Sequence, residues 1–430
     1  MHKLNPTILL GAGAALEIGA PSTQSITQEI IKPNKYSNYG TRNIYGEIPY
    51  YTAITKVYNR LKETYPCEPN FEHIFHVLEM LESYNRVWSH ECKNARIYPI
   101  ISPFVVPETN IVPHDEWDWL FSLIEQCKLD IMEMIDNYDK QYSENKETDY
   151  KWYKMFWESF ERFNLFNLNY DTTIEQSLSD FCDGFIQSDD VRFKKFNPKE
   201  LLQNRCSHKV CHLHGCILYS AERYKDRNHD VYEYKFHDMY KWGEFETVKS
   251  MLRGSSSSNP STQSGETINS GSIITGLRKP DKLTFVPYNY YHHYLNTSVL
   301  NNKSLLIIGY SFGDLYINDI IDRMNVLYGK DKRIVLITYW NYDTFEEYDG
   351  SVTCTFHGQE WNDSINLNEN EYIFIKRMMH DDSFEMKLLD KTIPNQSSYT
   401  SKDGDVKLFV YGFKSAVEKH SDEIVSFLTT

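Results

Sequence analysis

The stretch ILLGAGAALEIGAPS, residues 8–22, decides the fold, because an apolar run ends there in the turn Gly11-Ala12-Gly13. Residues 7–10 are typical of a short buried strand, and a helix or turn is expected to begin at Ala14. A glycine after a strand lets the backbone approach a pyrophosphate, and the following helix offers unpaired N–H groups to it. The stretch therefore predicts either a dinucleotide-binding turn or a plain tight turn.

This turn departs from the G-x-G-x-x-G fingerprint of dinucleotide-binding folds. Leu16 stands at the position of the third glycine, and the next glycine is Gly19. No clear acidic residue for a ribose follows about 20 residues later, at the end of a second strand. These departures argue against a conventional NAD-dependent dehydrogenase.

The composition argues against several classes of protein. A net charge of -15 over 430 residues disfavours a general basic surface for nucleic acid. No apolar run is long enough to span a bilayer, and residues 1–3 leave no room for a signal peptide before the first strand. The eight cysteines are scattered, so we expect reduced thiols in a cytoplasmic protein that contacts neither membrane nor nucleic acid.

The order of apolar patterns predicts the architecture. Helical spacing between the first strand and the next predicts a helical insertion at about residues 50–162. Short apolar runs typical of buried parallel strands occur at 163–168, 210–213, 305–308 and 334–338. Helix-compatible segments follow two of these runs. This alternation predicts an α/β fold with a Rossmann-like open parallel sheet.

Two segments differ from this pattern. Residues 254–272, GSSSSNPSTQSGETINSGS, are low in complexity and are expected to form a mobile loop within a domain at 1–345. Residues 346–430 contain short alternating runs and a final helical stretch. They predict a small β-rich C-terminal appendage with a terminal helix.

Polar residues follow the strand predicted at 163–168. Asp171 or Thr172 is suited to cap the next helix, and Thr172 with Glu175 fits a capping box. That leaves Asn169 unexplained, a polar residue at the carboxyl end of a buried strand. Because ligands bind at this edge of open parallel sheets, Asn169 is a candidate site residue.

The segment KVCHLHGCI, residues 209–217, places His212 and His214 on one face of a strand. A sharp turn at Gly215 gives room for a ligand, which favours chemistry over a buried structural histidine. The metal-binding alternative would use three cysteines with C-x4-C-x4-C spacing, Cys206, Cys211 and Cys216. Because no C-x2-C pair occurs in the chain, we expect no metal site.

The last such segment is LLIIGYSFGDLYINDII, residues 305–321. Its Gly309, Ser311 and Gly313 meet the pattern G-x-S-x-G on a strand–turn–helix, as an acyl hydrolase needs. A triad would also need a later acid and histidine. The later histidines all lie in the predicted appendage, at His357, His380 and His420. A serine acyl hydrolase using Ser311 is therefore an alternative ranked below nucleotide binding.

Taken together, these segments resemble the sirtuin-like superfamily. Sirtuins begin with G-A-G-[IV]-S followed by G-I-P, and the segments Gly11-Ala12-Gly13 and Gly19-Ala20-Pro21 stand at the same spacing. The sirtuin motifs Q-N-I-D, E-L-H-G and G-T-S are similar, in that order, to Leu168-Asn169-Tyr170-Asp171, His212-Leu213-His214-Gly215 and Gly309-Tyr310-Ser311.

The chain differs from sirtuin deacylases in three respects. It lacks their four-cysteine zinc module, Thr23-Gln24 replaces Phe-Arg, and Leu168 replaces the glutamine of Q-N-I-D. The segments NYD, LHG and GYSFGD resemble instead the sirtuin-like domains of bacterial antiphage systems, and so does NFEHIF at residues 70–75. Some proteins of that kind work with a separate HerA-type ATPase.

The resemblance implies an NAD glycohydrolase that releases nicotinamide and ADP-ribose and depletes NAD as an antiphage effector. It implies that Asn169 orients the ribose and a water, that His214 is the general base, and that Asp171 fixes the site geometry or contacts the nicotinamide end. The residues expected to hold NAD are Gly11, Ala12, Gly13, Gly19, Pro21, Gly309, Ser311 and Thr338.

The same resemblance implies that NAD is the substrate, that no metal takes part, and that the chain forms a homo-oligomer, with a HerA-type ATPase as a partner. The non-enzymatic alternative is a nucleotide-sensing assembly module. Such a module would bind NAD or ADP-ribose without turnover.

Overall fold

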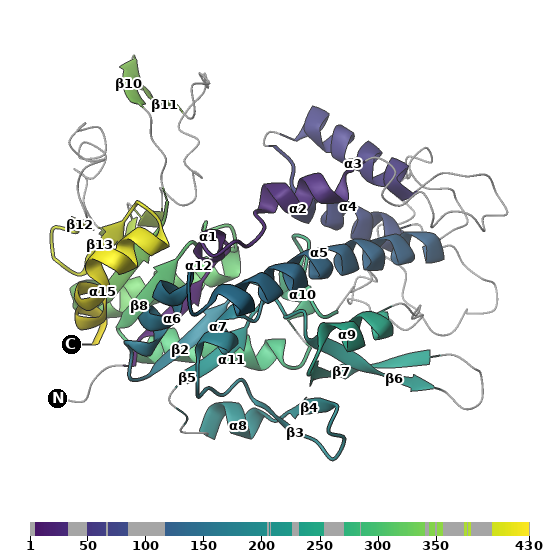
Figure 1. Ribbon diagram of the computed structural model, residues 1–430. Coiled ribbons are helices and arrows are strands. Elements are labelled where there is room, and N and C mark those ends of the chain that lie inside the picture. Colours follow the sequence, from purple (N-terminus) through teal and green to yellow (C-terminus); the bar gives the residue numbers. More distant parts are fainter. Residues whose placement is uncertain are drawn as a thin grey trace.

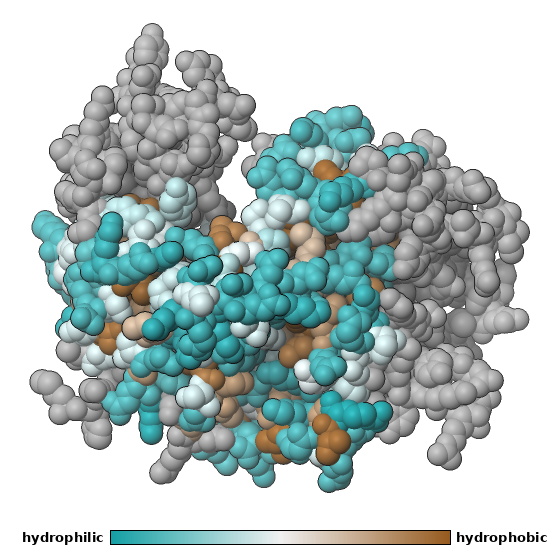
Figure 2. Space-filling model, viewed as in Figure 1, coloured by the Kyte–Doolittle hydropathy of each residue, from teal (hydrophilic) through white to brown (hydrophobic). Residues whose placement is uncertain are grey.

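The structure is a computed structural model of the chain. It describes residues 5–32, 50–65, 68–84, 117–203, 206, 208–225, 232–252, 271–283, 285–339, 344–348, 351–355, 374–375, 377–379 and 398–429. Within these ranges, no helix is long and apolar enough to cross a membrane. Hydrophilic side chains dominate the described face in Figure 2, and hydrophobic residues are scattered over it.

A seven-stranded sheet forms the centre of the molecule, with strand order β12-β13-β9-β8-β1-β2-β5 (Figure 1). Its strands are β1 (Thr7–Leu10), β2 (Phe163–Asn167), β5 (His208–His212), β8 (Ser304–Ile308), β9 (Arg333–Ile337), β12 (Tyr399–Thr400) and β13 (Val406–Phe409). All neighbours are parallel except β12 and β13. The predicted open parallel sheet is confirmed.

The strand order contains a switch point between β1 and β8. From β1 the chain continues through β2 to β5 on one side, and from β8 it continues through β9 to β13 on the other. Leu10, the last residue of β1, is level with Asn167 on β2 and with Ile308 on β8. Ligands bind outside the carboxyl ends of strands at such a point, so the fold defines one crevice to examine.

Both faces of the sheet are buried, which explains why its central strands β1, β8 and β9 are largely apolar. Leu9 belongs to one hydrophobic cluster, whereas Ile8 and Leu10 belong to another. The first cluster includes Leu295 and Ile317, from helices on one face, and the second includes residues from helices on the other. This is the packing expected of a doubly wound α/β sheet.

Helices fill the long connection between β1 and β2, as the predicted helical insertion requires. They are α1 (Gly13–Leu16), α2 (Thr23–Ile30), α3 (Tyr50–Thr64), α4 (Phe71–Tyr84), α5 (Trp117–Asn145) and α6 (Lys151–Glu158). In Figure 1 the helices α2 to α4 gather at the end of the molecule opposite β12 and β13. The later helices are α7 (Thr173–Ser177), α8 (Pro198–Gln203), α9 (Phe245–Leu252), α10 (Lys279–Lys282), α11 (Tyr288–Asn301), α12 (Leu315–Tyr328) and α15 (Phe413–Thr429), with the short 3-10 helix η3 (Gly329–Asp331).

The C-terminal part of the chain differs from the predicted appendage. Strand β13 pairs with β9 in the main sheet, and helix α15 packs against α6 and β9. Phe413 lies edge-on to the rings of Tyr153 and Phe156, with centroids 5.8 and 5.3 Å away. Residues 398–429 therefore complete the core. The expectation of a separate appendage was wrong there because strand pairing is set by contacts distant in sequence.

A second, antiparallel sheet was not predicted. It has four strands in the order β3-β4-β7-β6. They are β3 (Phe185–Gln187), β4 (Phe193–Phe196), β6 (Tyr219–Lys225) and β7 (Tyr232–Trp242). A separate hairpin joins β10 (Thr344–Tyr348) to β11 (Ser351–Thr355). The loop predicted at 254–272 lies outside the described residues except at its last two positions.

Candidate functional site

The glycine turn after β1 packs backbone to backbone on the turn after β8. The N–H groups of Gly11 and Gly13 donate to the carbonyls of Ile308 and Gly309, both at 2.9 Å. Gly309 has a φ of 59°, and a Cβ on it would lie 2.1 Å from the nitrogen of Ala14. No side chain fits between the two turns. The glycines are therefore required for this direct packing of the two turns, which we call the interlock.

This interlock changes what the turn can offer a ligand. The N–H groups of Gly11 and Gly13 are bonded to the β8 turn, and α1 has only four residues, with Ala12 as an N-cap that makes no side-chain hydrogen bond. The expected helix N-terminus is thus short. The exposed residue of the turn is Ala12, whose side chain is a single methyl group, so a nucleotide could still approach the backbone closely there.

Gly19 and Pro21 have structural explanations of their own. Gly19, with a φ of 96°, follows the end of α1 and donates its N–H to the Leu16 carbonyl at 3.1 Å. Pro21 precedes Ser22, whose hydroxyl caps α2 by accepting from the N–H of Ser25 at 3.0 Å. Their contact with NAD stays a prediction.

Asn169 follows β2 and reaches the glycine turn. Its side-chain Nδ2 donates to the carbonyl of Gly11 at 3.1 Å, although the two residues are 158 positions apart. Its backbone N–H donates to Oδ1 of the buried Asn167 at 3.0 Å. The amide predicted from the end of the strand therefore lies beside the turn after β1.

Asp171 is buried in the protein interior rather than exposed in the crevice. It is 2% exposed, and its Oδ1 accepts from the N–H and hydroxyl of Thr173 at 3.1 and 2.6 Å. Burial raises the pKa of the Asp171 carboxyl. Asp171 precedes the N-cap residue Thr172, and these contacts hold the start of α7.

The capping box expected from Thr172 and Glu175 does not form. The Thr172 hydroxyl donates instead to Oδ2 of Asp139 on α5, at 2.7 Å. Glu175 turns toward His212, 2.7 Å from its Nε2. Side chains from α5 and β5 thus override the local pattern, because they bring stronger partners than the backbone of α7.

His214 lies in the turn after β5, which ends at His212. Its Nε2 is 3.2 Å from Oδ2 of Asp314, and the residue is only 5% exposed. Burial lowers the pKa of the imidazole, and the positive charge of Lys279 lowers it further against the opposing effect of Asp314. His214 is therefore suited to be neutral near pH 7, as a general base must be.

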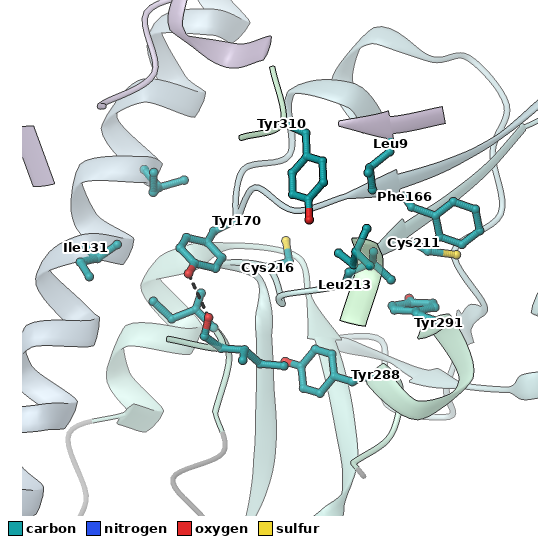
Figure 3. Packing of buried hydrophobic residues seen from close by; sticks show 14 of the residues in the cluster. Leu9, Ile131, Phe166, Tyr170, Cys211, Leu213, Cys216, Tyr288, Tyr291 and Tyr310 are labelled. Carbon is teal, nitrogen blue, oxygen red and sulfur yellow. Dashed lines mark hydrogen bonds between the residues drawn. The ribbon is translucent and has the colours of Figure 1, made fainter. Parts of the chain in front are cut away.

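Gly215 allows the next segment to close over this turn. It has a φ of 95°, and a Cβ on it would lie 2.1 Å from the carbonyl oxygen of Ser272. The carbonyl of His214 accepts from the N–H of Ile274 at 2.7 Å. Figure 3 shows Tyr170 beside this segment, with its hydroxyl bonded to the Ile274 carbonyl at 3.0 Å. The Tyr170 hydroxyl thus holds the residue whose N–H bonds to the carbonyl of His214.

Asp314 is the functional candidate that the sequence analysis missed. Its Oδ1 caps α12 by accepting from the N–H groups of Tyr316 and Ile317 at 3.0 and 3.3 Å. Its Oδ2 is the oxygen that faces His214. Although burial raises its pKa, the hydrogen bond from His214 and the charges of His214 and Lys279 hold that pKa well below the ordinary range. The carboxylate is therefore ionised beside the imidazole.

The segment NFEHIF borders the same region. Asn70 caps α4 through Oδ1, which accepts from the N–H of Glu72 at 3.0 Å. Glu72 then pairs with Lys279 of α10 at 3.3 Å. Because Lys279 acts electrostatically on both His214 and Asp314, the start of α4 belongs to the electrostatic surroundings of the site.

The loop carrying Ser311 does not have the geometry of a nucleophile elbow. That motif places the serine itself in the strained turn. Here the strained residue is Phe312, with a φ of 55°; among the described residues it is the only non-glycine with a positive φ. His420 lies on α15, 3.1 Å from Glu423, and His357 and His380 lie outside the described residues. These observations do not support the acyl-hydrolase alternative.

Thr338 follows β9 at the same edge of the sheet. Its N–H donates to the carbonyl of Phe409, and its own carbonyl accepts from Gly412, both at 2.9 Å. These bonds join β9 to the exit of β13. A contact between Thr338 and the adenosine ribose remains a prediction.

The scattered cysteines do not make a metal centre in the described part of the chain. No group of three or more His, Cys, Asp or Glu side chains able to hold a metal occurs there. Cys211 and Cys216 are both fully buried.

The fold is a doubly wound α/β sheet, and polar residues follow the carboxyl ends of β2, β5 and β8. Residues 164–353 match the family model described as SIR2-like domain, a family of generally NAD-consuming enzymes. The chain thus contains a SIR2-like domain, and the match spans Asn169, His214 and Asp314. No curated protein matches the chain.

Proposed function

We propose that the protein is an NAD glycohydrolase, which cleaves the bond between nicotinamide and ribose to give nicotinamide and ADP-ribose. The observation that supports this most directly is that polar residues following three strands of the sheet make long-range contacts there, Asn169 with the glycine turn and His214 with Asp314. The SIR2-like domain supports NAD as the substrate. NAD itself is consumed, so no redox cofactor is needed.

The reaction needs little covalent participation by the protein. Nicotinamide leaves with the electron pair of the glycosidic bond, and the ribose passes through an oxocarbenium-like state that water captures. His214 takes a proton from that water or from a ribose hydroxyl. Asn169, held by Gly11, orients the ribose and the water.

Asp314 completes a dyad with His214. A carboxylate beside a catalytic imidazole fixes its orientation and stabilises the imidazolium that forms when it takes the proton. The same carboxylate caps α12 and is held there by two backbone N–H groups. The position of the base is therefore tied to a helix terminus.

The remaining predicted contacts enter the proposal as NAD-binding residues. They are Gly11, Ala12, Gly13, Gly19, Pro21, Gly309, Ser311 and Thr338. Asp171 acts indirectly, by holding α7. An antiphage role through NAD depletion, a homo-oligomer and a HerA-type ATPase partner are also proposed, and the NYD, LHG and GYSFGD segments support them.

The test is to incubate the protein with NAD, with and without the product of a neighbouring gene, and to follow nicotinamide by chromatography. Asn169→Ala and His214→Ala should each lower kcat by about 10²–10⁴-fold, the usual effect of losing a general base or its equivalent. Their circular dichroism should stay that of the wild type.

Matched controls lie at the opposite ends of the same strands. Asn164 on β2 accepts from the hydroxyl of Tyr294 at 2.9 Å, and the ring of His208 on β5 lies tilted against that of Phe163, with centroids 4.1 Å apart. Asn164→Ala and His208→Ala should keep wild-type kcat. Full turnover in both Asn169→Ala and His214→Ala would refute the assignment, and tight NAD binding without nicotinamide release would favour the sensing module.

A further inference from the structure

His212, two residues before the proposed base, has acceptors at both ring nitrogens. It is fully buried at the end of β5. Its Nε2 lies 2.7 Å from Oε1 of Glu175, and its Nδ1 lies 3.3 Å from the backbone carbonyl oxygen of Asn169. A carbonyl oxygen can only accept, so the second contact requires a proton on Nδ1.

The first contact requires a proton as well. Although burial raises the pKa of Glu175, the charges of His212 and Lys241 lower it to about 2, so this carboxylate is ionised and can only accept. A neutral imidazole has one N–H and would leave a lone pair facing an oxygen. Both hydrogen bonds form together only when His212 is an imidazolium.

The surrounding charges are consistent with this cation. Lys241 of β7 lies 3.4 Å from Glu175 and 2.6 Å from Asp183, so that two cations and two anions form one buried network. Burial lowers the pKa of His212 and so does Lys241, but Glu175 and the carboxylate of Asp171 raise it above its ordinary value. Among the described residues, Tyr219 on β6 is a titratable neighbour with its ring centroid 6.0 Å from that of His212, and the buried thiol of Cys216 interacts electrostatically with Glu175 and Lys241.

The contact between His212 and the Asn169 carbonyl connects this buried charge network to the candidate site. The N–H of Asn169 is held by Asn167, its side chain by the Gly11 carbonyl, and its own carbonyl by His212. The first two bonds alone allow the peptide group after Asn169 to rotate. The third fixes that group and with it the direction of the side-chain amide.

We propose that His212 is a positioning residue for the reaction, an imidazolium at neutral pH that Glu175 holds in place and that clamps the Asn169 carbonyl so that the amide faces the ribose. This inference rests on the proposed function for its kinetic consequences. The double protonation of His212 does not depend on whether the protein turns over NAD.

The kinetic test compares two histidines on one strand. His212→Leu should lower kcat by about 10–100-fold, as expected when a site residue is displaced by about 1 Å, with KM changed less than about twofold. His208→Leu, at the other end of β5, should leave both constants unchanged. A wild-type kcat in folded His212→Leu would overturn the proposal.

A second variant covers the case in which His212→Leu fails to fold. In Glu175→Gln the charges still balance, because a neutral His212 can place its one proton on Nδ1, toward Asn169, while the Gln amide donates to Nε2. Activity at pH 7 should therefore stay within about threefold of the wild type. Loss of activity in folded Glu175→Gln would contradict the clamp.

The pH profile separates positioning from a purely structural ion pair. In the wild type, kcat should fall as the pH rises through the raised pKa of His212, because Glu175 retains the proton on Nε2 and the proton lost is the one facing Asn169. Glu175→Gln should lack this alkaline decrease. The same decrease in both proteins would overturn the proposal.

Nitrogen-15 NMR of the histidine rings distinguishes failure of this inference from failure of the proposed function. At pH 7 the His212 signals, assigned by their loss in His212→Leu, should show two protonated nitrogens in the wild type and one in Glu175→Gln. A single protonated nitrogen in the wild type would refute the clamp. If no nicotinamide is released, the proposed function fails and this measurement still decides the state of His212.

Discussion

His212 and His214 are separated by one residue, yet their surroundings prepare them for opposite tasks. His214 faces Asp314, and its pKa is lowered by burial and by Lys279. His212 faces Glu175, and its pKa is raised despite burial. One imidazole is thus available to accept a proton, and the other is held as a cation. The difference comes entirely from partners far away in the sequence.

The Asp314–His214 pair gives a prediction with a defined sign. Asp314→Asn keeps an oxygen to cap α12 but removes the charge that stabilises protonated His214, so the pKa of His214 should fall further. The acid limb of kcat/KM should then move to lower pH, and kcat should fall by up to about 100-fold. Profiles of kcat/KM against pH for the two proteins check this.

An acid limb that stays in place, or moves to higher pH, would remove Asp314 from the proposed dyad. The thermal midpoint provides the control, because the cap is preserved in Asp314→Asn and the change in unfolding free energy should be small.

At the scale of elements, two turns that follow neighbouring strands form one unit. The turn after β1 and the turn after β8 touch through Gly13 and Gly309 without any intervening side chain. Both the Asn169 contact and the start of α12 depend on this unit, since Asn169 bonds to Gly11 and Asp314 lies five residues beyond Gly309.

Gly309→Ala should therefore be strongly destabilising. Its φ is 59°, which costs an alanine about 1–2 kcal/mol, and its Cβ would also overlap the Ala14 nitrogen at 2.1 Å. Gly404, between β12 and β13, has a φ of 75° with nothing within 4 Å of a Cβ, so Gly404→Ala should show the φ cost alone. Denaturant unfolding measures both, and equal losses would contradict the interlock.

The sequence predicts elements better than the contacts between them. Strands β1, β2, β5, β8 and β9 were predictable because each contains a short run rich in apolar residues, which burial on both faces favours. The second sheet was missed because β3 and β4 are short and β7 carries many polar and aromatic residues. The error concerning Thr172 and Glu175 has the same origin, since their actual partners come from distant elements.

For the candidate site, too, individual residues could be predicted from the sequence better than the contacts between them. Asn169, His214 and the glycine turn were found because polar residues and glycines stand out at the ends of apolar strands. Asp314 could be read as a helix cap, but its second oxygen meets a histidine 100 positions away. Nothing local in the sequence indicates such a pairing.

At the scale of the whole molecule, the C-terminal segment completes the sheet. Strand β13 covers β9, and α15 places Phe413 among the rings of α6. Phe413 is 2% exposed. The stability of the domain that carries the site therefore depends on residues near the end of the chain.

Phe413→Ala should lower the free energy of unfolding by about 3–5 kcal/mol, the usual cost of removing a buried aromatic ring. Leu327→Ala, at a position 59% exposed, should change it by less than about 0.5 kcal/mol. Chemical denaturation gives both values. A small loss in Phe413→Ala would mean that α15 contributes little to the core.

The strand order also has a consequence for synthesis on the ribosome. The glycine turn emerges first, Asn169 and His214 follow, and Asp314 comes later still, with β13 needed to close the sheet. Because the site draws on strand ends spread over most of the chain, a nascent polypeptide carries only fragments of it. A complete site can therefore form only after the ribosome has synthesised all of these segments.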